Sequence, residues 1–487
     1  MSQPLPSIEE VDVAEGEAAL QAATQAEGSA VSIPDNIFRD YDIRGIANTE
    51  ITESLAEQIG QAVGSEALDH GETQLIVGRD GRNTSDSFSE QLIQGILRTG
   101  CSVVNIGPAT TPMMYFACHH FDGINSGVEV TASHNPAEYN GFKIMINGET
   151  LFGEAIQKLK QRIQQGNFHQ GKGSEQPFDV AEAYTLRILE DIILDEFKVV
   201  VDAGNGIAGA IAPNLLEELG CEVTPLYCDV DGSFPNHTPD PSIEENLSDL
   251  VAKVSEIGAD LGIALDGDGD RLCLVTASGR ILWPDEILML LARDVITRNP
   301  GCDILYDVKS SRHLGELISS YGGRPVMWKT GHSHMKTKLK QLNAPLGGEF
   351  SGHIFFNERW FGFDDGLYAA ARVMEIMTLR EQSLDDMAAA IPTSVTTPEL
   401  KITVDENHKF ELIQSLTDSG NFDDAKLTKI DGIRADYPHG WGLVRASNTS
   451  PALTLRFEAD SPDALKNIQE IFRRELQAVD NQLSLPF

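Results

Sequence analysis

A serine in a short, turn-forming stretch is the first residue of this sequence whose setting could support chemistry. The stretch, Thr131-Ala-Ser-His-Asn-Pro136, follows an apolar-alternating run that predicts a strand ending near Thr131. Pro136 lacks an N–H group and suits the start of a helical turn. The Ser133 hydroxyl could then lie among free backbone N–H groups, which bind phosphate. Taken alone, the stretch is better explained as a solvent-facing turn, because loops are rich in serine and asparagine.

A second stretch, Asp266-Gly-Asp-Gly-Asp-Arg271, offers three carboxylates separated by glycines. It follows the apolar run Leu261-Gly-Ile-Ala-Leu265, which predicts a buried strand. Glycine lets the backbone curl, so the carboxylates can converge, and converging carboxylates need a hard cation such as Mg²⁺ or Ca²⁺. An EF-hand is excluded because its sixth and twelfth positions hold Arg271 and Ala277. Few other protein ligands are present, which favours Mg²⁺, although a solvated acidic turn is the alternative. The carboxylates are those of Asp266, Asp268 and Asp270.

The third stretch is Pro345-Leu-Gly-Gly-Glu-Phe-Ser-Gly-His353, in which glycines flank three polar side chains. Glu349, Ser351 and His353 alternate, so in an extended segment all three would point to one side. A carboxylate and a hydroxyl can hold vicinal sugar hydroxyls, and an imidazole can move protons. A glycine-rich hairpin without a chemical role explains the same residues equally well.

The fourth stretch, Arg445-Ala-Ser-Asn-Thr-Ser-Pro451, combines a guanidinium fork with three hydroxyls and an amide. This inventory suits a phosphate group that is bound without reacting. Lys329-Thr-Gly-His332 and Asp307-Val-Lys309 add positive groups after predicted strands. An exposed polar turn is the alternative interpretation.

Strands and helices alternate along most of the chain and must position these stretches. This pattern predicts an α/β fold of mostly parallel sheets, with helices on their faces. In such sheets ligands bind at the carboxyl ends of strands. Phe38 to Gly45 is predicted as a loop, and Gly166 to Gln176 as a linker. The strand–helix pattern restarts twice after the linker, which indicates internally related domains. Strands are predicted at 74–78, 102–107, 127–131, 141–146, 198–202, 222–226, 261–265, 302–308, 400–404 and 452–457, and helices at 87–99 and 462–479.

Composition narrows the class of protein. The 487 residues allow three or four domains, and a hydrophobic content of 41% is typical of a globular chain. No apolar run approaches the roughly 18 residues that span a bilayer. The 74 acidic and 37 basic residues give a net charge of −37, which disfavours nucleic acid and anionic membranes as partners.

The cysteines and the N-terminal segment indicate a compartment. The 6 cysteines show no C-x-x-C spacing and no dense framework, as expected of buried thiols in a reducing compartment. We therefore expect a cytoplasmic location. Residues 1–32 are acidic and contain no arginine or lysine, so they resemble neither a signal peptide nor a transit peptide. We expect them to form a disordered acidic extension or a loosely attached helix.

The four stretches, in this order and spacing, resemble the α-D-phosphohexomutase superfamily, and most closely its bacterial phosphomannomutase/phosphoglucomutase branch. Asn140-Gly-Phe-Lys143 and Trp360-Phe-Gly-Phe-Asp-Asp-Gly366 add to the resemblance, which extends from about residue 35 to the C-terminal region. The departures are small. Ala132 stands where many members have glycine, and Phe350 where they have methionine or another residue.

The resemblance implies an α/β architecture with four domains around a central cleft. The first three would be related α/β domains with mixed or parallel sheets, and the fourth a smaller C-terminal α+β domain. The expected parts are the extension 1–32, a domain with the phosphoserine loop at 33–176, one with the metal loop at 177–280, one with the sugar-binding loop at 281–392, and one with the phosphate-binding loop at 393–487.

The resemblance also implies roles for individual residues. Ser133 would carry a phosphoryl group and, with Asp266, Asp268 and Asp270, would hold Mg²⁺. Lys143 and His353 are the candidate proton-transfer groups, and Arg271 would act beside them. The residues expected to bind substrate are Tyr41, Arg44, Lys309, His332, Glu349, Ser351, Arg445, Ser447, Asn448 and Thr449.

The reaction implied is the interconversion of hexose 1-phosphate and hexose 6-phosphate, with mannose or glucose as the sugar. Phosphoserine would give its phosphoryl group to the free hydroxyl, and hexose 1,6-bisphosphate would be both intermediate and activator. The alternatives are a phosphoglucosamine mutase, a Mg²⁺-dependent sugar phosphatase and a non-catalytic sugar-phosphate binding module. We expect a monomer or a weak oligomer, with neither nucleic acid nor membrane as a partner.

Overall fold

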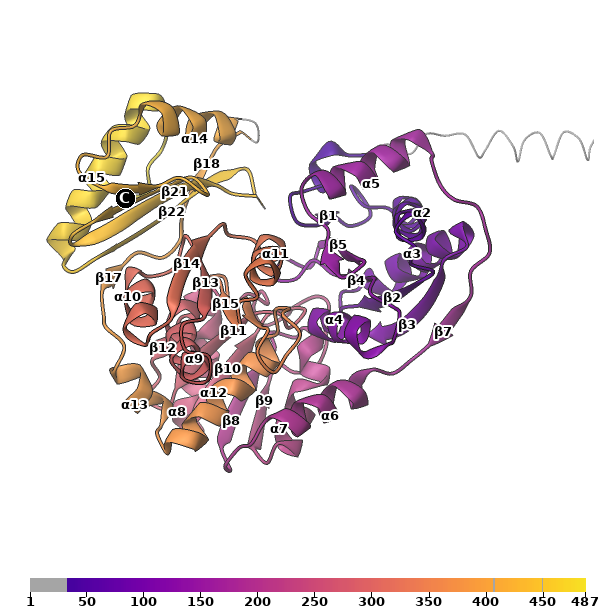
Figure 1. Ribbon diagram of the computed structural model, residues 1–487, viewed down its shortest axis with the longest axis horizontal. Helices are drawn as coiled ribbons and strands as arrows, with labels where there is room; N and C mark the ends of the chain where they lie inside the picture. The colour runs from indigo at the N-terminus through magenta and orange to yellow at the C-terminus, as the bar shows by residue number, and fades with distance from the viewer. Residues whose placement is uncertain (1–32, 406–407, 449) are drawn as a thin grey trace, which may run out of the picture. The chain divides into compact units, whose positions relative to one another are not determined.

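The computed structural model describes residues 33–405, 408–448 and 450–487. The extension expected at 1–32 lies outside these ranges. Residues 36–487 form one compact unit. Four β-sheets follow one another along this unit, as the colour gradient of Figure 1 shows.

The first sheet joins a parallel centre to an antiparallel edge. Its order is β1-β5-β4-β2-β3-β7, with β6 paired to β5. Its strands are β1 (Ile43–Ile46), β2 (Gln74–Arg79), β3 (Ser102–Pro108), β4 (Gly127–Val130), β5 (Tyr139–Ile146), β6 (Glu149–Thr150) and β7 (Glu175–Pro177). The helices of this part are α2 (Glu53–Asp69), α3 (Ser85–Thr99), α4 (Thr111–His120) and α5 (Glu154–Gln165). Strands β3, β2 and β4 run parallel, and β5 turns back against β4.

The second sheet repeats this design in the order β12-β11-β10-β8-β9. Its strands are β8 (Lys198–Asp202), β9 (Glu222–Leu226), β10 (Leu261–Leu265), β11 (Leu272–Thr276) and β12 (Ile281–Leu282). The helices of this part are α6 (Ala181–Asp191), α7 (Ala212–Glu218) and α8 (Ser248–Ile257). Strands β9, β8 and β10 are parallel, and β11 is antiparallel to β10. The three valines of β8 and all of β10 are buried, as their apolar runs predict.

The third sheet has the order β14-β13-β15-β16. Its strands are β13 (Asp303–Asp307), β14 (Arg324–Trp328), β15 (Leu346–Gly348) and β16 (Ile354–Phe356). The helices are α9 (Pro284–Arg298), α10 (Arg312–Ser320), α11 (His332–Leu342), α12 (Gly366–Arg380) and α13 (Leu384–Ala389). Strands β14, β13 and β15 are parallel, and β16 returns antiparallel to β15.

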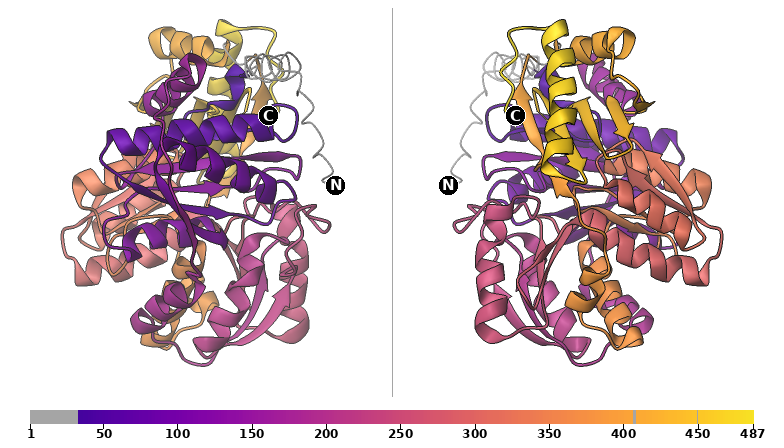
Figure 2. Two further views of the ribbon diagram at one scale, coloured as in Figure 1. Left: turned by 90° about the vertical axis from the view of Figure 1, so that its right-hand side faces the viewer. Right: turned by 90° about the vertical axis from the view of Figure 1, so that its left-hand side faces the viewer.

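The fourth sheet is antiparallel throughout, with the order β17-β22-β21-β20-β19 and β18 paired to β22. Its strands are β17 (Val395–Thr396), β18 (Leu400–Thr403), β19 (Lys426–Thr428), β20 (Ile433–Tyr437), β21 (Gly440–Ala446) and β22 (Ala452–Ala459). Its helices are α14 (His408–Ser419) and α15 (Pro462–Val479). Ser461 caps α15 by accepting from Ala464 N, and Pro462 stands in its first turn. Both helices lie along the sheet (Figures 1 and 2), and apolar residues of α15 join the core of this domain.

One structural pattern recurs in all four parts. Each sheet contains an antiparallel strand pair, namely β4–β5, β10–β11, β15–β16 and β21–β22. The connection within each pair holds one of the four polar stretches found in the sequence. One hydrophobic core runs through the first three sheets, and the C-terminal part has a core of its own. The predicted α/β architecture with a smaller α+β domain is therefore confirmed.

Two local predictions are wrong. Arg44 lies on strand β1 and not in a loop, because Ile43 and its neighbours pair with β5. Part of the predicted linker forms β7, which pairs with β3. Pro136 does begin a single turn, in which Tyr139 N donates to Pro136 O at 3.1 Å before β5 starts. No helix in the described ranges is long and apolar enough to cross a membrane.

Candidate functional site

Ser133 lies at the carboxyl end of β4 in a backbone conformation that is rare for a residue with a side chain. Its φ is 48°, in the left-handed region, and its side chain is buried. The hydroxyl donates to Asp266 Oδ2 at 2.6 Å. A Cβ on Gly267 would lie 2.4 Å from Ser133 O, so the metal loop can approach this closely only with glycine there. Such strain persists where surrounding structure holds it, and it is frequent at functional sites.

Arg82 holds the serine loop in place, and the sequence did not identify it. Its guanidinium is buried beside Asp80, with Nε donating to that carboxylate at 3.1 Å. The two terminal nitrogens donate to four backbone carbonyls of the loop. These belong to Ser133 (2.8 Å), Asn135 (2.6 Å), Pro136 (2.7 Å) and Tyr139 (3.0 Å). His134, next to the serine, contacts Asp240 through Nδ1 at 2.7 Å.

Asp266, Asp268 and Asp270 converge as predicted. All three are fully buried, and one oxygen of each lies within 4.8 Å of the others. Burial, and then the charges of Asp268 and Asp270, raise the pKa of Asp266 well above its usual value. Within the described residues, Oδ1 of Asp268 and Oδ1 of Asp270 have no hydrogen-bond partner. Free carboxylate oxygens in a buried cluster fit a hard divalent cation such as Mg²⁺.

Lys143 reaches this cluster from β5. Its Nζ lies 2.7 Å from Asp268 Oδ2 and 2.5 Å from Asp270 Oδ2. Burial lowers the pKa of Lys143, but the neighbouring aspartates more than compensate and raise it above its usual value. Thr111, at the start of α4, donates to Asp268 Oδ2 at 2.7 Å. The proton-transfer candidate Lys143 is therefore held at the metal loop.

His353 adjoins the same cluster from the third sheet. Its Nε2 accepts from Arg271 Nε at 3.1 Å, and its Nδ1 lies 3.4 Å from Asp270 Oδ1. The same Nδ1 lies 2.9 Å from Asp364 Oδ2. Arg271 also lies 3.7 Å from Asp266. The proton-transfer candidate His353 and the cation Arg271 are thus brought to the carboxylate cluster.

The Glu349–His353 stretch is not extended but forms the hairpin that the sequence left open as the alternative. It forms the turn of the β15–β16 hairpin, in which Glu349 N donates to His353 O at 2.9 Å. Glu349 and His353 therefore face each other across the hairpin, and Ser351 lies half-buried at the turn. One oxygen of Glu349 accepts from Gly331 N, and the other has no partner among the described residues. Burial raises the pKa of this carboxyl.

The remaining substrate-binding candidates come from several sheets. Tyr41 OH donates to Thr330 O at 3.3 Å, and its ring meets the edge of His332. Arg44 Nη1 donates to Asn135 Oδ1 at 2.8 Å in the serine loop. Lys309 Nζ donates to Glu399 Oε2 at 3.0 Å. Burial, followed by Lys336, lowers the pKa of His332 well below its usual value, which leaves it neutral.

The C-terminal stretch adjoins the first and third sheets. Arg445 is buried and its Nε donates to Asp431 Oδ2 at 2.9 Å, while Nη2 has no partner among the described residues. Asn448 Nδ2 donates to Tyr41 OH and to Asp40 Oδ2. Ser447 Oγ accepts from Ser450 N at 3.2 Å. Thr449 lies outside the described residues.

A cavity of about 270 Å³ opens beside this stretch. Residues of the first, third and fourth sheets line it, including Asp40, Lys329, Asp431 and Asn448. Arg445 adjoins this cavity through Asp431, to which its Nε donates at 2.9 Å, and Lys329 adds a second positive group to the lining. Neither positive group comes from the part of the chain that holds Asp266, Asp268 and Asp270.

Asp364 is the other residue of this region that the sequence did not single out as functional. It lies in the Trp360–Gly366 stretch and is fully buried. It contacts His353 at 2.9 Å and Lys336 Nζ at 2.9 Å. The sequence carried one signal for Asp364. Two aspartates precede α12, but only Asp365 is needed to cap the helix, because Asp365 accepts from Tyr368 N.

Comparisons with known proteins all lead to one family. Sequence-family descriptions named phosphoglucomutase/phosphomannomutase match in series: alpha/beta/alpha domain I at residues 35–170, domain II at 181–279, domain III at 283–395 and the C-terminal domain at 399–475. A phosphomannomutase/phosphoglucomutase from Pseudomonas aeruginosa is 52% identical over 459 residues, covering 94% of this chain and 99% of its own. A phosphoglucomutase from Neisseria gonorrhoeae is 45% identical, covering 92% and 98%. The crystal structure of a family protein from Burkholderia thailandensis has a TM-score of 0.89 at 45% identity, covering 94% and 100%.

Proposed function

The chain belongs to the phosphoglucomutase/phosphomannomutase family, and we propose that it interconverts the 1-phosphate and the 6-phosphate of a hexose, with mannose or glucose as the sugar. It is an intramolecular phosphotransferase of the isomerase class. One observation carries the assignment of the nucleophile. The buried Ser133 hydroxyl lies 2.6 Å from Asp266 within a cluster of three buried carboxylates.

The proposed reaction transfers one phosphoryl group in each direction. Phosphoserine 133 gives its phosphoryl group to the free sugar hydroxyl, so the Ser133 O–P bond breaks and a sugar O–P bond forms. The hydroxyl proton passes to His353, which adjoins the cluster. The other proton-transfer candidate, Lys143, is held as a cation by Asp268 and Asp270, so it can donate a proton but cannot accept one. The resulting hexose 1,6-bisphosphate turns around, and its other phosphoryl group returns to Ser133.

The carboxylates of Asp266, Asp268 and Asp270, together with an oxygen of phosphoserine 133, would hold Mg²⁺. When bound, the ion neutralises charge on the phosphoryl oxygens. Two partnerless carboxylate oxygens support this assignment. Arg271 adds a positive charge on the same side, 3.7 Å from Asp266.

Substrate contacts are divided among the other loops. Glu349 and Ser351 would accept and donate hydrogen bonds to sugar hydroxyls, and the C-terminal loop would bind the phosphate that does not react. That phosphate site comprises Arg445, Ser447, Asn448 and Thr449. Further substrate contacts, between this site and Ser133, come from Tyr41, Arg44, Lys309 and His332.

The proposed domain boundaries are 33–176, 177–280, 281–392 and 393–487. We also propose that the protein is cytoplasmic, that it is a monomer or a weak oligomer, and that hexose 1,6-bisphosphate activates it.

The test follows both the products and the phosphoenzyme. Purified protein with Mg²⁺ and a trace of glucose 1,6-bisphosphate is given mannose 1-phosphate, glucose 1-phosphate or glucosamine 1-phosphate, and ³¹P and ¹H NMR identify the products. We expect the 6-phosphates of mannose or glucose with no release of inorganic phosphate. Intact-protein mass spectrometry should show an added phosphate that Ser133→Ala lacks.

A matched variant, Ser174→Ala, removes an exposed serine far along the chain from the loop and should behave as wild type. Stoichiometric release of inorganic phosphate would identify a phosphatase instead. Phosphate mapped to another residue, with Ser133→Ala still active, would refute the nucleophile assignment alone and leave the mutase activity standing.

A further inference from the structure

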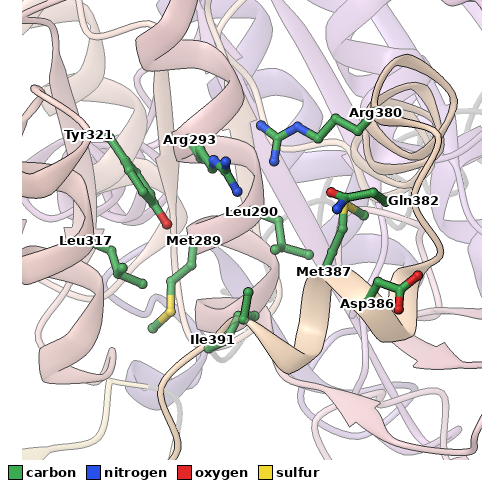
Figure 3. A pocket seen from close by; sticks show the side chains of 11 residues that line it. Met289, Leu290, Arg293, Leu317, Tyr321, Arg380, Gln382, Asp386, Met387 and Ile391 are labelled. Carbon is green, nitrogen blue, oxygen red and sulfur yellow. The ribbon is translucent and has the colours of Figure 1, made fainter.

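Two arginines that lack a carboxylate partner among the described residues line a cavity between helices α9, α10, α12 and α13. The cavity measures about 70 Å³. Met289, Leu290 and Met387 are among its apolar lining residues, and Arg293, Arg380 and Tyr321 are among its polar ones. Figure 3 shows the Arg380 side chain extending toward Arg293, with Leu290 below them. None of the lining residues belongs to the Ser133 site.

The absence of a counter-ion is unusual in this protein. The chain carries twice as many acidic as basic residues, 74 against 37. Nearly every other arginine of the described residues has a carboxylate within 4.0 Å. Arg293 and Arg380 have neither such a partner nor a side-chain hydrogen bond to another described residue. Arg293 instead lies 5.9 Å from the centroid of the Tyr321 ring.

The two guanidinium groups also repel each other. Burial lowers the pKa of Arg380, and the positive charge of Arg293 lowers it further. Asp294 attracts Arg380 from a greater distance, but its carboxylate already pairs with Arg298 at 2.6 Å. Asp386 also lines the cavity, but its Oδ2 accepts from Ser383 Oγ at 2.7 Å and it forms no ion pair with either arginine. The two like charges therefore have no ion-pair partner among the described residues.

We propose that this cavity is a separate, non-catalytic binding site for a phosphate group, either as inorganic phosphate or on a small phosphomonoester. Two planar guanidinium forks match a dianion, whereas a carboxylate would neutralise only one of them. The Tyr321 hydroxyl and the Gln382 amide line the same cavity and add possible donors. Leu290, Leu317 and Ile391 line the same cavity, so an apolar substituent on an ester would meet apolar side chains there.

The cavity and the Ser133 site can be probed independently because α12 separates them. Gly366, at the start of this helix, donates to Gly269 O in the metal loop at 3.2 Å. Arg380 is at the other end of the helix. At about 1.5 Å per residue, the helix spans roughly 20 Å between the two.

The experiment uses the two methionines of the cavity as reporters. The full-length protein is labelled with ¹³C-methyl methionine, and the Met289 and Met387 signals are assigned with Met289→Leu and Met387→Leu. Inorganic phosphate and phenyl phosphate are then titrated separately at constant ionic strength. We expect saturable shifts of both signals. Arg293→Gln and Arg380→Gln should each weaken binding about ten-fold or more, because each removes charge-assisted hydrogen bonds.

The matched control is Arg324→Gln. It removes an exposed arginine of the third sheet, and this arginine pairs with Asp303. It should bind as wild type, and all three arginine variants should retain mutase activity. Saturation by inorganic phosphate identifies the free ion as a sufficient ligand, and saturation by phenyl phosphate alone identifies an ester. If neither probe saturates, or if the double variant Arg293→Gln/Arg380→Gln binds as wild type, the proposal is wrong.

Discussion

His353 Nδ1 lies 2.9 Å from Asp364 Oδ2, while Nε2 of the same ring accepts from Arg271 Nε at 3.1 Å. Because Nε2 accepts, the proton of the neutral imidazole belongs on Nδ1, beside the buried Asp364 carboxylate. A carboxylate in this position fixes the tautomer and orientation of a histidine. Nε2, the imidazole nitrogen that faces Arg271, is then the one that can take a proton.

Asp364→Asn should therefore lower kcat about 10–100-fold with little change in KM, because the amide cannot stabilise the same imidazole charge. Steady-state kinetics of hexose phosphate interconversion measure kcat and KM separately. The neighbouring Asp365→Asn is the control, since Asp365 accepts from Tyr184 OH and caps α12 without contacting His353. An equal loss of kcat in both variants, or a rise in KM alone for Asp364→Asn, would contradict the positioning role.

Asp365 should also give a pH dependence of stability. Burial raises its pKa to about 7 from an ordinary value of 3.8, so the folded protein holds a proton that the unfolded chain releases in this window. Stability therefore falls as pH rises through the window. Asp365→Asn removes this dependence, and its Tm relative to wild type should rise from pH 4 to pH 7. Calorimetric scans at several pH values test this, and a constant Tm difference would show that the carboxyl is ionised throughout.

Asp268→Asn should weaken Mg²⁺ binding about ten-fold or more and remove most activity, because one charge leaves a buried three-carboxylate site. Titration calorimetry with Mg²⁺ measures the affinity, and circular dichroism checks that the variant folds. Asp303→Asn, which removes an aspartate that pairs with exposed Arg324, serves as the control. A rate that depends on Mg²⁺ in the same way for Asp268→Asn and wild type would exclude this loop as the metal site.

Arg445→Ala should raise KM about 10–100-fold, the usual cost of losing hydrogen bonds to a charged group. It should also release more hexose bisphosphate, because the C-terminal loop would no longer hold the distal phosphate. Arg445→Lys should recover little of the lost affinity for sugar phosphate, since an ammonium cannot form the two parallel hydrogen bonds of a guanidinium. A single-turnover reaction with labelled intermediate measures the released fraction. Arg474→Ala, at an exposed arginine of the same domain, is the control. An unchanged KM for Arg445→Ala, with no additional release of bisphosphate, would show that Arg445 does not hold the distal phosphate.

Local sequence was sufficient for most of the strands. The predicted strands at Lys198–Asp202, Glu222–Leu226 and Leu261–Leu265 and the helix at Pro462–Val479 have these bounds in the structure. Each is a run whose residue types prefer one conformation and whose ends carry turn or capping residues. The Asp266–Asp270 loop also converged as predicted, since alternating glycines permit a tight curl.

Predictions that depended on the conformation between two strands were less successful. Glu349, Ser351 and His353 alternate in the sequence, but glycines also permit a hairpin, and pairing of β15 with β16 selects it. Arg44 was assigned to a loop because Phe38 to Gly45 mixes aromatic, acidic and basic residues and ends in glycine, and only pairing with β5 makes Ile43–Ile46 a strand. Arg82 was not singled out, since its four carbonyl partners lie more than fifty residues away.

The sequence by itself determined the chemical groups and the local shape of each loop. Residue type sets charge and hydrogen-bonding capacity, and glycine spacing sets how tightly the backbone can turn. Tertiary structure alone decided which groups meet. Ser133 reaches Asp266 across 133 positions of the chain, and His353 reaches Asp364 and Arg271 from another hairpin. Such contacts depend on how whole domains pack, because the free energy of burying their apolar surfaces, and not any local preference, brings these loops together.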